Sequence, residues 1–325
     1  MKNNLLRTSA LVGALLFMLS SVSIYAVTEK GAINTSGSVY KYIDVYSDDK
    51  VENSQEVNAS ITDPVQIEKL KNLGFTEDEI STFSVSEYEK YKDLNGTLVS
   101  KTNKYYRVKK NSIIEVTKLQ AEREVKAYNQ EKALKLATSG SYSINSGGTD
   151  TENTSWLSMT TTISDLGGKH FAFKNSFRWL SLPLCVFTDV VGMTHSSSIS
   201  IDQGSEYLRY TYDVYIDKNY TSFLRTDSAY NMTADKKNSS GYAFEYDLIG
   251  YTSDGYYASN NRGYMVYTGV ATPTNFVGKA HAYGHYSHQQ LAAPISIDLV
   301  SGNLSCSPSL AFDEATDTDA EFNIG

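Results

Sequence analysis

The feature that most constrains the fold is a two-residue alternation of apolar and polar side chains that recurs between residues 156 and 312. The stretch YLRYTYDVYID over residues 207–217 is the clearest case. One face carries Leu208, Tyr210, Tyr212, Val214 and Ile216, and the other carries Arg209, Thr211, Asp213, Tyr215 and Asp217. Successive side chains of a strand point to opposite faces, so this pattern predicts a strand with one buried face. About eight to ten such segments predict a mostly β protein with an antiparallel β-sandwich or barrel-like C-terminal domain.

The segment 63–137 has a different pattern and predicts a small α+β N-terminal unit. Asp63 before Pro64 predicts the start of one helix, and Thr76 with Glu79 has the spacing of a capping box for a second. Short strands follow, and then a helix from about Lys118 to Ala137. Residues 27–62 read as a loose arm, residues 138–155 as a Ser/Gly/Thr-rich linker, and residues 313–325 as a loose acidic tail.

The first 26 residues have the layout of a secretory signal peptide. Lys2 and Arg7 precede the apolar run LVGALLFML, and small residues lead to Ala26. The run is shorter than the roughly 20 apolar residues that a membrane-spanning helix needs. We therefore predict cleavage near Ala26, no transmembrane segment afterwards, and a secreted, extracellular or cell-surface protein.

The charge balance limits the partners of the mature chain. Removal of residues 1–26 leaves 27 basic and 37 acidic residues, a net charge of −10. This excess of acid disfavours nucleic acid and anionic lipid as ligands. Cys185 and Cys306 are the only cysteines, and their small or apolar neighbours predict two buried free thiols.

The run FKNSFRWLSLPLCVFTDVVGM, the leader and the helix pair in LKNLGFTEDEI resemble a set of uncharacterised secreted proteins of Gram-positive bacteria. The resemblance implies secretion and assigns no activity to any residue.

Motifs for nucleophilic, metal-dependent or nucleotide chemistry, such as G-x-S-x-G, H-E-x-x-H and the P-loop, are missing from the sequence. An extracellular hydrolase would need Asp189, Glu206, Glu245 or a histidine to converge in a cleft. Asp189 lies among apolar residues, which predicts burial with a partner such as Arg178. Asp213, Asp217 and Asn219 lack the spacing of a calcium loop.

Tyrosine is the residue type that stands out, with 25 in the chain. Tyr207 and Tyr215 share the predicted wet face of their strand with Arg209 and Asp213. Aromatic rings flanked by polar groups stack on ligands and also suit protein interfaces. These four residues are therefore candidate ligand-binding residues, with strand formation by tyrosine as the structural alternative.

The stretch KAHAYGHYSH over residues 279–288 holds three of the five histidines. Its alternation predicts a strand whose wet face carries His281, Tyr283 and His285, and these join the candidate ligand-binding residues. His281 and His285 would lie about 13 Å apart at roughly 3.3 Å per residue. One zinc ion cannot take both as ligands. No metal or other cofactor is predicted.

The sequence thus favours a secreted, non-enzymatic binding or interaction protein. Its partner would be a glycan, the cell wall or a protein surface. Two alternatives stay open: an extracellular hydrolase, and a membrane-active β-rich toxin whose alternating strands rearrange into a barrel.

Overall fold

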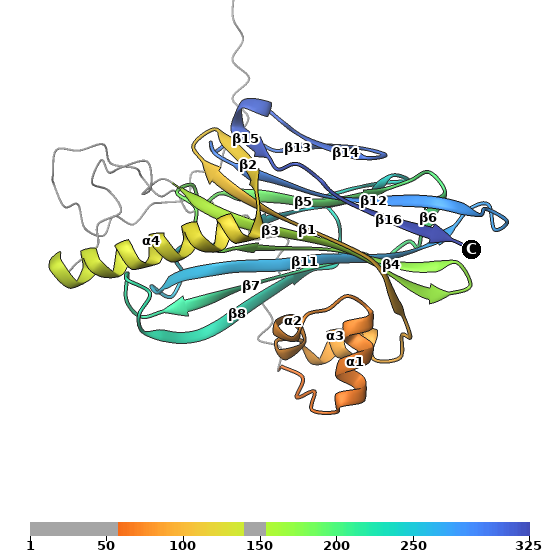
Figure 1. The fold of residues 1–325 in the computed structure, drawn as a ribbon, viewed down its shortest axis with the longest axis horizontal. Coiled ribbons are helices and arrows are strands. Elements are labelled where there is room, and N and C mark those ends of the chain that lie inside the picture. The colour runs from red at the N-terminus through yellow and green to blue at the C-terminus, as the bar shows by residue number, and fades with distance from the viewer. Residues whose placement is uncertain (1–57, 140–153) are drawn as a thin grey trace, which may run out of the picture. The chain divides into compact units, whose positions relative to one another are not determined.

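The structure, a computed structural model, describes residues 58–139 and 154–325 (Figure 1). The predicted signal peptide, most of the N-terminal arm and most of the linker lie outside these residues.

Two antiparallel sheets form the body of the protein. The larger has the strand order β2-β1-β3-β4-β11-β7-β8, with β6 paired to β11. Its strands are β1 (Thr97–Lys109), β2 (Ser112–Val116), β3 (Ser155–Gly167), β4 (His170–Trp179), β6 (Ile199–Ile201), β7 (Tyr207–Tyr215), β8 (Phe223–Asn231) and β11 (Tyr257–Ala271).

The smaller sheet has the order β15-β12-β5-β10-β9, with β16 paired to β12. Its strands are β5 (Thr188–His195), β9 (Lys236–Asn238), β10 (Gly241–Asp247), β12 (Gly278–Gln289), β15 (Phe312–Glu314) and β16 (Thr318–Ile324). A separate hairpin of β13 (Ser296–Val300) and β14 (Asn303–Ser307) leads to a short 3₁₀ helix, Ser309–Ala311. The hairpin packs on the outer face of this sheet, where Leu299 and Leu304 cover Val190.

Side chains from both sheets meet in one large core. Aromatic residues of β4, including Phe173, Phe177 and Trp179, pack against Met193 of β5 and Tyr286 of β12. Burial of such large rings on the facing sides of two sheets is what the period-two pattern requires. The predicted mostly β, antiparallel sandwich is confirmed.

Three short helices precede the first sheet strand, α1 (Pro64–Asn72), α2 (Glu77–Ser81) and α3 (Val85–Tyr91). The side chain of Asp63 accepts a hydrogen bond from the Val65 N–H, and Thr76 with Glu79 forms the predicted capping box. The helices share a second core with the outer face of the larger sheet, where Phe75 and Phe83 pack on Tyr264.

Helix α4 (Lys118–Ser139) confirms the helix predicted from Lys118. It is joined to the larger sheet by Glu124, which accepts hydrogen bonds from the Trp156 indole and the Arg107 guanidinium. Because β1 pairs with β3 along most of its length, segment 63–137 and the β-rich segment share one sheet. The predicted linker therefore does not separate two independent sheets.

We expected the C-terminal acidic segment to be a loose tail. It instead forms strands β15 and β16. Ala320, Phe322 and Ile324 alternate with exposed acidic and polar residues and enter the main core. The prediction failed because the high acid content of the segment obscured its period-two pattern.

Candidate functional site

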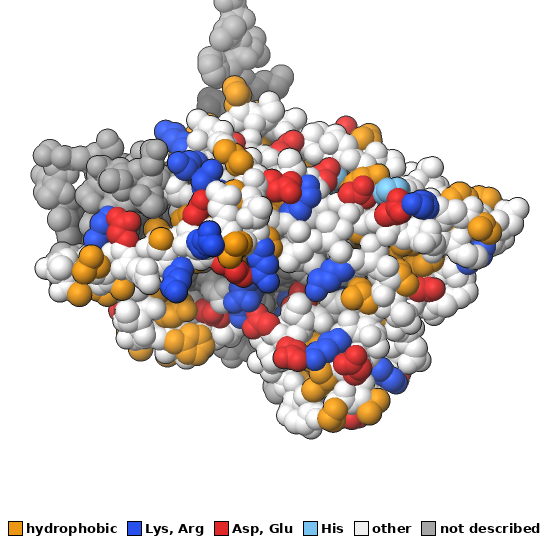
Figure 2. Space-filling view, in the orientation of Figure 1, with side chains coloured by type: hydrophobic (Ala, Val, Ile, Leu, Met, Phe, Trp, Pro, Cys, Tyr) orange, Lys and Arg blue, Asp and Glu red, His pale blue; other side chains and the backbone are white. Residues whose placement is uncertain are grey.

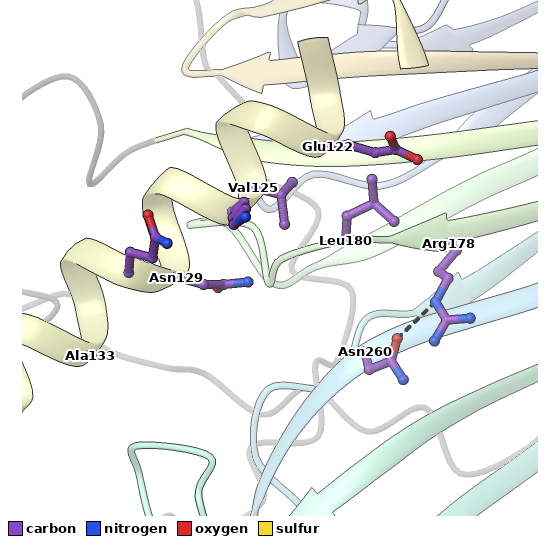
Figure 3. Close-up of a pocket in the computed structure, with 9 residues that line it drawn as sticks. Glu122, Val125, Asn129, Ala133, Arg178, Leu180 and Asn260 are labelled. Carbon is purple, nitrogen blue, oxygen red and sulfur yellow. Dashed lines mark hydrogen bonds between the residues drawn. The ribbon is translucent and has the colours of Figure 1, made fainter. Parts of the chain in front are cut away.

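A cavity of about 720 Å³ opens between helix α4 and the outer face of the larger sheet. Figure 3 shows α4 on one side of the cavity and Arg178 and Asn260 on the other. The cavity is lined by Glu122, Val125, Lys126, Asn129, Gln130, Ala133, Arg178, Leu180 and Asn260. It is a shallow depression that is largely open to solvent and not an enclosed pocket. We call this cavity the cleft.

A β-bulge positions Asn260 in the cleft. The register between β11 and β7 shifts between Ser259 and Arg262, and Asn260 has a φ of 55°, a conformation that asparagine tolerates better than most residues. The side chain of Asn261 is buried and bonds the backbone N–H and C=O of Ile249, which anchors the bulge. Asn260 accepts a hydrogen bond from Nε of Arg178 at 3.0 Å.

Asp213 is held behind the cleft by three groups. Its carboxylate accepts hydrogen bonds from Asn260 (2.5 Å), Arg262 (3.0 Å) and Thr226 (2.9 Å). Both carboxylate oxygens are engaged and the side chain is only 14% exposed, so Asp213 does not present a bare charge. Asp213 does not line the cleft itself but holds Asn260, which does.

An aromatic cluster lies beside the cleft at the end of β7, β8 and β11. Tyr215 contacts Tyr220 and Phe223, and Tyr257 contacts Tyr220 and Tyr251, with ring centroids 5.2–6.4 Å apart. Figure 2 shows hydrophobic side chains gathered below α4 at the end where β7 and β8 meet. We call these five residues the aromatic cluster.

Helix α4 borders both features. Lys126, Asn129 and Gln130 line the cleft, and Nζ of Lys132 lies 4.4 Å from the centroid of the Tyr220 ring. Burial lowers the pKa of Lys132, and the charge of Asp217 opposes that shift. Burial also raises the pKa of Tyr215, and Asp213 adds to that shift. Helix α4 therefore contributes residues both to the cleft lining and to the contact with the aromatic cluster.

Tyr207 and Arg209 do not lie on a solvent-exposed face of β7, contrary to our prediction. Both are buried because α1–α3 cover this end of β7. Arg209 forms an ion pair with Glu87 of α3 and donates to the Thr82 carbonyl. These two residues attach the helices to the sheet and do not line the cleft.

The three clustered histidines lie on strand β12, as predicted, and each pairs with an aspartate. His281 contacts Asp319 at 2.8 Å, and its ring stacks on Tyr283 at the partly exposed surface. His285, which we expected to be wet, is 1% exposed because β16 and the β13–β14 hairpin border it. None of His281, Tyr283 and His285 lines the cleft.

His285 makes hydrogen bonds in the order found in a catalytic triad. Its Nδ1 lies 2.6 Å from Asp317 and its Nε2 lies 2.8 Å from the Thr194 hydroxyl. Thr194 is fully buried, however, and its oxygen also accepts a hydrogen bond from the Gly302 N–H. A nucleophile in this position has no access to substrate, so the arrangement is a structural network.

The carboxylates that a hydrolase would need do not converge. Asp189 is buried as predicted, but its partners are Tyr286, His288 and the Gln289 N–H, not Arg178. Glu206 is buried beside Lys237, and Glu245 lies on β10 of the other sheet. None of the three lines the cleft.

Two further findings concern metals and membranes. Within residues 58–139 and 154–325, no three His, Cys, Asp or Glu side chains are grouped to hold a metal ion. In the same part of the chain, every helix is too short or too polar to cross a bilayer.

Cys185 and Cys306 are free thiols, and Cys306 is buried.

Sequence reasoning missed most of the cleft. Arg178 was considered only as a partner for Asp189, and Asn129, Gln130 and Asn260 were not singled out. The one local signal was the Asn260–Asn261 pair, which interrupts an otherwise alternating strand and is typical of a bulge.

Comparison with known proteins does not assign the chain to a family. No protein-family model matches the sequence, and no curated protein matches it. Among solved structures, it is similar to a pore-forming protein, with 8% identity, a TM-score of 0.24, and coverage of 52% of this chain and 85% of that one. It is also similar to Clostridium perfringens delta-toxin, with 9% identity, a TM-score of 0.20, and coverage of 53% and 88%. TM-scores this low do not define a shared fold.

Proposed function

We propose that the protein is a secreted, non-enzymatic glycan-binding protein, and that the cleft with the adjoining aromatic cluster is its ligand site. The observation that carries the proposal is the composition of the cleft. Planar amide and guanidinium groups of Asn129, Gln130, Asn260 and Arg178 lie around a surface that is mostly apolar. Such groups are suited to the hydroxyls of a sugar, because amides both donate and accept hydrogen bonds.

The aromatic cluster supplies the second requirement of sugar recognition. The C–H face of a sugar ring is apolar and packs against an aromatic ring. Tyr215 and Tyr257 are half-buried, and Phe223 and Tyr251 are exposed at 58% and 51%. A ligand that extends from the cleft along α4 would reach these rings.

Binding is favoured over hydrolysis by the distribution of carboxylates. Among the described residues that line the cleft, Glu122 is the only carboxylate. Most glycoside hydrolases need two carboxyl groups on opposite sides of the scissile bond. The acids next to the lining residues are paired with arginines, Asp78 with Arg178 and Arg262, and Asp213 with Arg262.

The test is binding of the mature protein to a glycan array and to cell-wall fractions, followed by calorimetry with the best ligand. We expect Tyr215→Ala and Asn129→Ala each to weaken binding by about tenfold, which corresponds to about 1.4 kcal/mol. Tyr283→Ala is the matched control, because Tyr283 is a half-buried tyrosine on the other sheet.

The controls also separate the remaining classes of function. If Tyr283→Ala loses glycan binding and Tyr215→Ala binds as well as wild type, the site lies on β12 and the proposal is wrong. A negative array together with leakage from liposomes would favour the membrane-active alternative. A negative array together with release of reducing sugar from the cell wall would favour a hydrolase.

A further inference from the structure

The carboxylate of Asp78 lies between two arginines at the edge of the cleft. Its Oδ2 is 3.0 Å from Nη1 of Arg178 and 3.2 Å from Nε of Arg262. Asp78 belongs to α2, and the two arginines lie side by side on β4 and β11. The side chains of Asp78 and Arg178 are 48% and 41% exposed. An ion pair with this exposure contributes little stability, so an external anion can displace the carboxylate from Arg178 at small cost. The side chain of Arg262 is 13% exposed.

A second, smaller cavity surrounds this ion pair. It has a volume of about 150 Å³, and its lining includes both arginines, the carboxyl residues Asp78 and Glu79, and several hydroxyl side chains, among them Ser158, Thr160 and Thr211. Arg178 lines both cavities, so the smaller one adjoins the cleft. A water molecule occupies about 30 Å³ in the liquid. The smaller cavity therefore has room for a carboxylate or sulfate group with water beside it.

The arginines have hydrogen-bonding capacity for such a group. Contacts with Asn260 and Asp78 engage two of the five N–H groups of Arg178 among the described residues. Arg262 is fixed in place by Asp213, which is only 14% exposed. Of the two acids that contact the arginines, Asp78 is thus the one open to exchange.

We propose that the ligand of the cleft is an oligosaccharide with an isolated anionic substituent, which binds Arg178 and Arg262 in the place of the Asp78 carboxylate. The substituent is a carboxylate or a sulfate ester, since both match the planar donors of arginine. The net charge of −10 of the predicted mature chain opposes a polyanion, so a single charge on an otherwise neutral chain is the chemistry that fits. The sugar part of this inference rests on the proposed function, and the anion site does not.

The experiment compares three forms of one oligosaccharide by calorimetry: neutral, uronic acid-bearing and sulfated. The readout is the ratio of anionic to neutral affinity, which cancels effects on the rest of the site. Asp78→Asn removes the internal competitor and is expected to raise this ratio about tenfold, and Arg178→Gln to lower it about tenfold. Asp298→Asn makes the same charge change on an exposed residue of the β13–β14 hairpin and should leave the ratio unchanged.

A ratio that does not move in Asp78→Asn and Arg178→Gln overturns the inference. A preference of the wild-type protein for the uronic acid or the sulfated form identifies the anionic group. If no oligosaccharide binds, the proposed function is wrong, and titration with free D-glucuronate and inorganic sulfate, followed by NMR, decides the anion site. Stronger perturbation of Thr160 and Thr211 in Asp78→Asn than in wild type supports it. No binding of either probe to Asp78→Asn overturns it.

Discussion

The Nζ atom of Lys174, in the middle of β4, lies 2.9 Å from both carboxylate oxygens of Glu79 on helix α2. The lysine side chain is 2% exposed, and Ser176 and the Gly74 carbonyl complete its hydrogen bonds. Burial lowers the pKa of Lys174, and Glu79 opposes that shift. Helix α2, which borders the smaller cavity, is therefore attached to the sheet through a desolvated ion pair.

We expect Lys174→Met to destabilise the protein by about 3–5 kcal/mol, because it leaves the Glu79 carboxylate without its partner. The double variant with Glu79→Leu should recover part of this loss. The measurement is urea-induced unfolding followed by tryptophan fluorescence. Lys279→Met, which breaks an exposed pair with Glu321, is the control and should leave the midpoint unchanged. Equal effects of both lysine substitutions would contradict the assignment.

Close approach of the two sheets depends on Gly284 of β12. A Cβ atom at this position would lie 2.6 Å from the side-chain oxygen of Asn175 and closer still to the Thr161 hydroxyl. We expect Gly284→Ala to cost about 1–3 kcal/mol of the free energy of unfolding, as overpacking does elsewhere. Gly250→Ala is the matched control, since its nearest contacts would be an ordinary 3.5 Å. The measurement is thermal unfolding. If both variants have the same free energy of unfolding as the wild type, the sheets can separate locally at Gly284.

The sequence predicted the strands better than it predicted what covers them. Leu208 and Val214 are buried on the expected face of β7, because the period-two pattern fixes which side chains point inward. Tyr207 and Arg209 were placed wrongly because α1–α3 pack on the opposite face, which is a tertiary contact between segments more than 100 residues apart. Alternation within one strand carries no information about such a layer.

The cleft was unpredictable for the same reason. It brings together α4, β4 and the bulge of β11, and each contributes polar residues that are unremarkable in their own segments. Asp213 and Tyr215 were correctly placed near each other, since they share a strand face, but their neighbours Asn260 and Tyr220 come from the bulge and the turn. The charge of a residue can be read from a sequence, whereas its partner across a sheet depends on register.

The hydrogen-bonded set Asp317, His285 and Thr194 provides a test of the hydrolase alternative. Thr194→Val keeps the shape of the side chain but removes the partner of His285 Nε2 and of the Gly302 N–H. We expect a loss of about 1–3 kcal/mol of stability, the cost of buried groups without partners. Hydrolysis of p-nitrophenyl acetate should equal the buffer rate in both wild type and variant. Hydrolysis by the wild type that is lost in Thr194→Val would show that the set is catalytic.

The last prediction concerns Asp217, whose carboxylate organises the turn between β7 and β8 and so positions Tyr215 and Tyr220. It accepts hydrogen bonds from the backbone N–H groups of Asn219, Thr221 and Ser222. Burial alone would raise its pKa, but the hydrogen bonds from Ser222 and Thr221 prevail and lower it from 3.8 to about 2. A carboxyl group with a lowered pKa stabilises the folded state above pH 3.8, and this contribution is lost as the pH falls through about 2.

The backbone amide resonance of Ser222 should therefore remain unshifted down to pH 3.8 and move with a midpoint near pH 2. In Asp217→Asn the same resonance should show no such transition, because the amide does not titrate in this range. Asp217→Ala should also weaken glycan binding, as Tyr215→Ala does, because the turn would no longer hold the rings of Tyr215 and Tyr220 in contact. A midpoint at 3.8 in the folded protein, or full glycan affinity in Asp217→Ala, would show that the carboxylate neither fixes the turn nor supports the aromatic cluster.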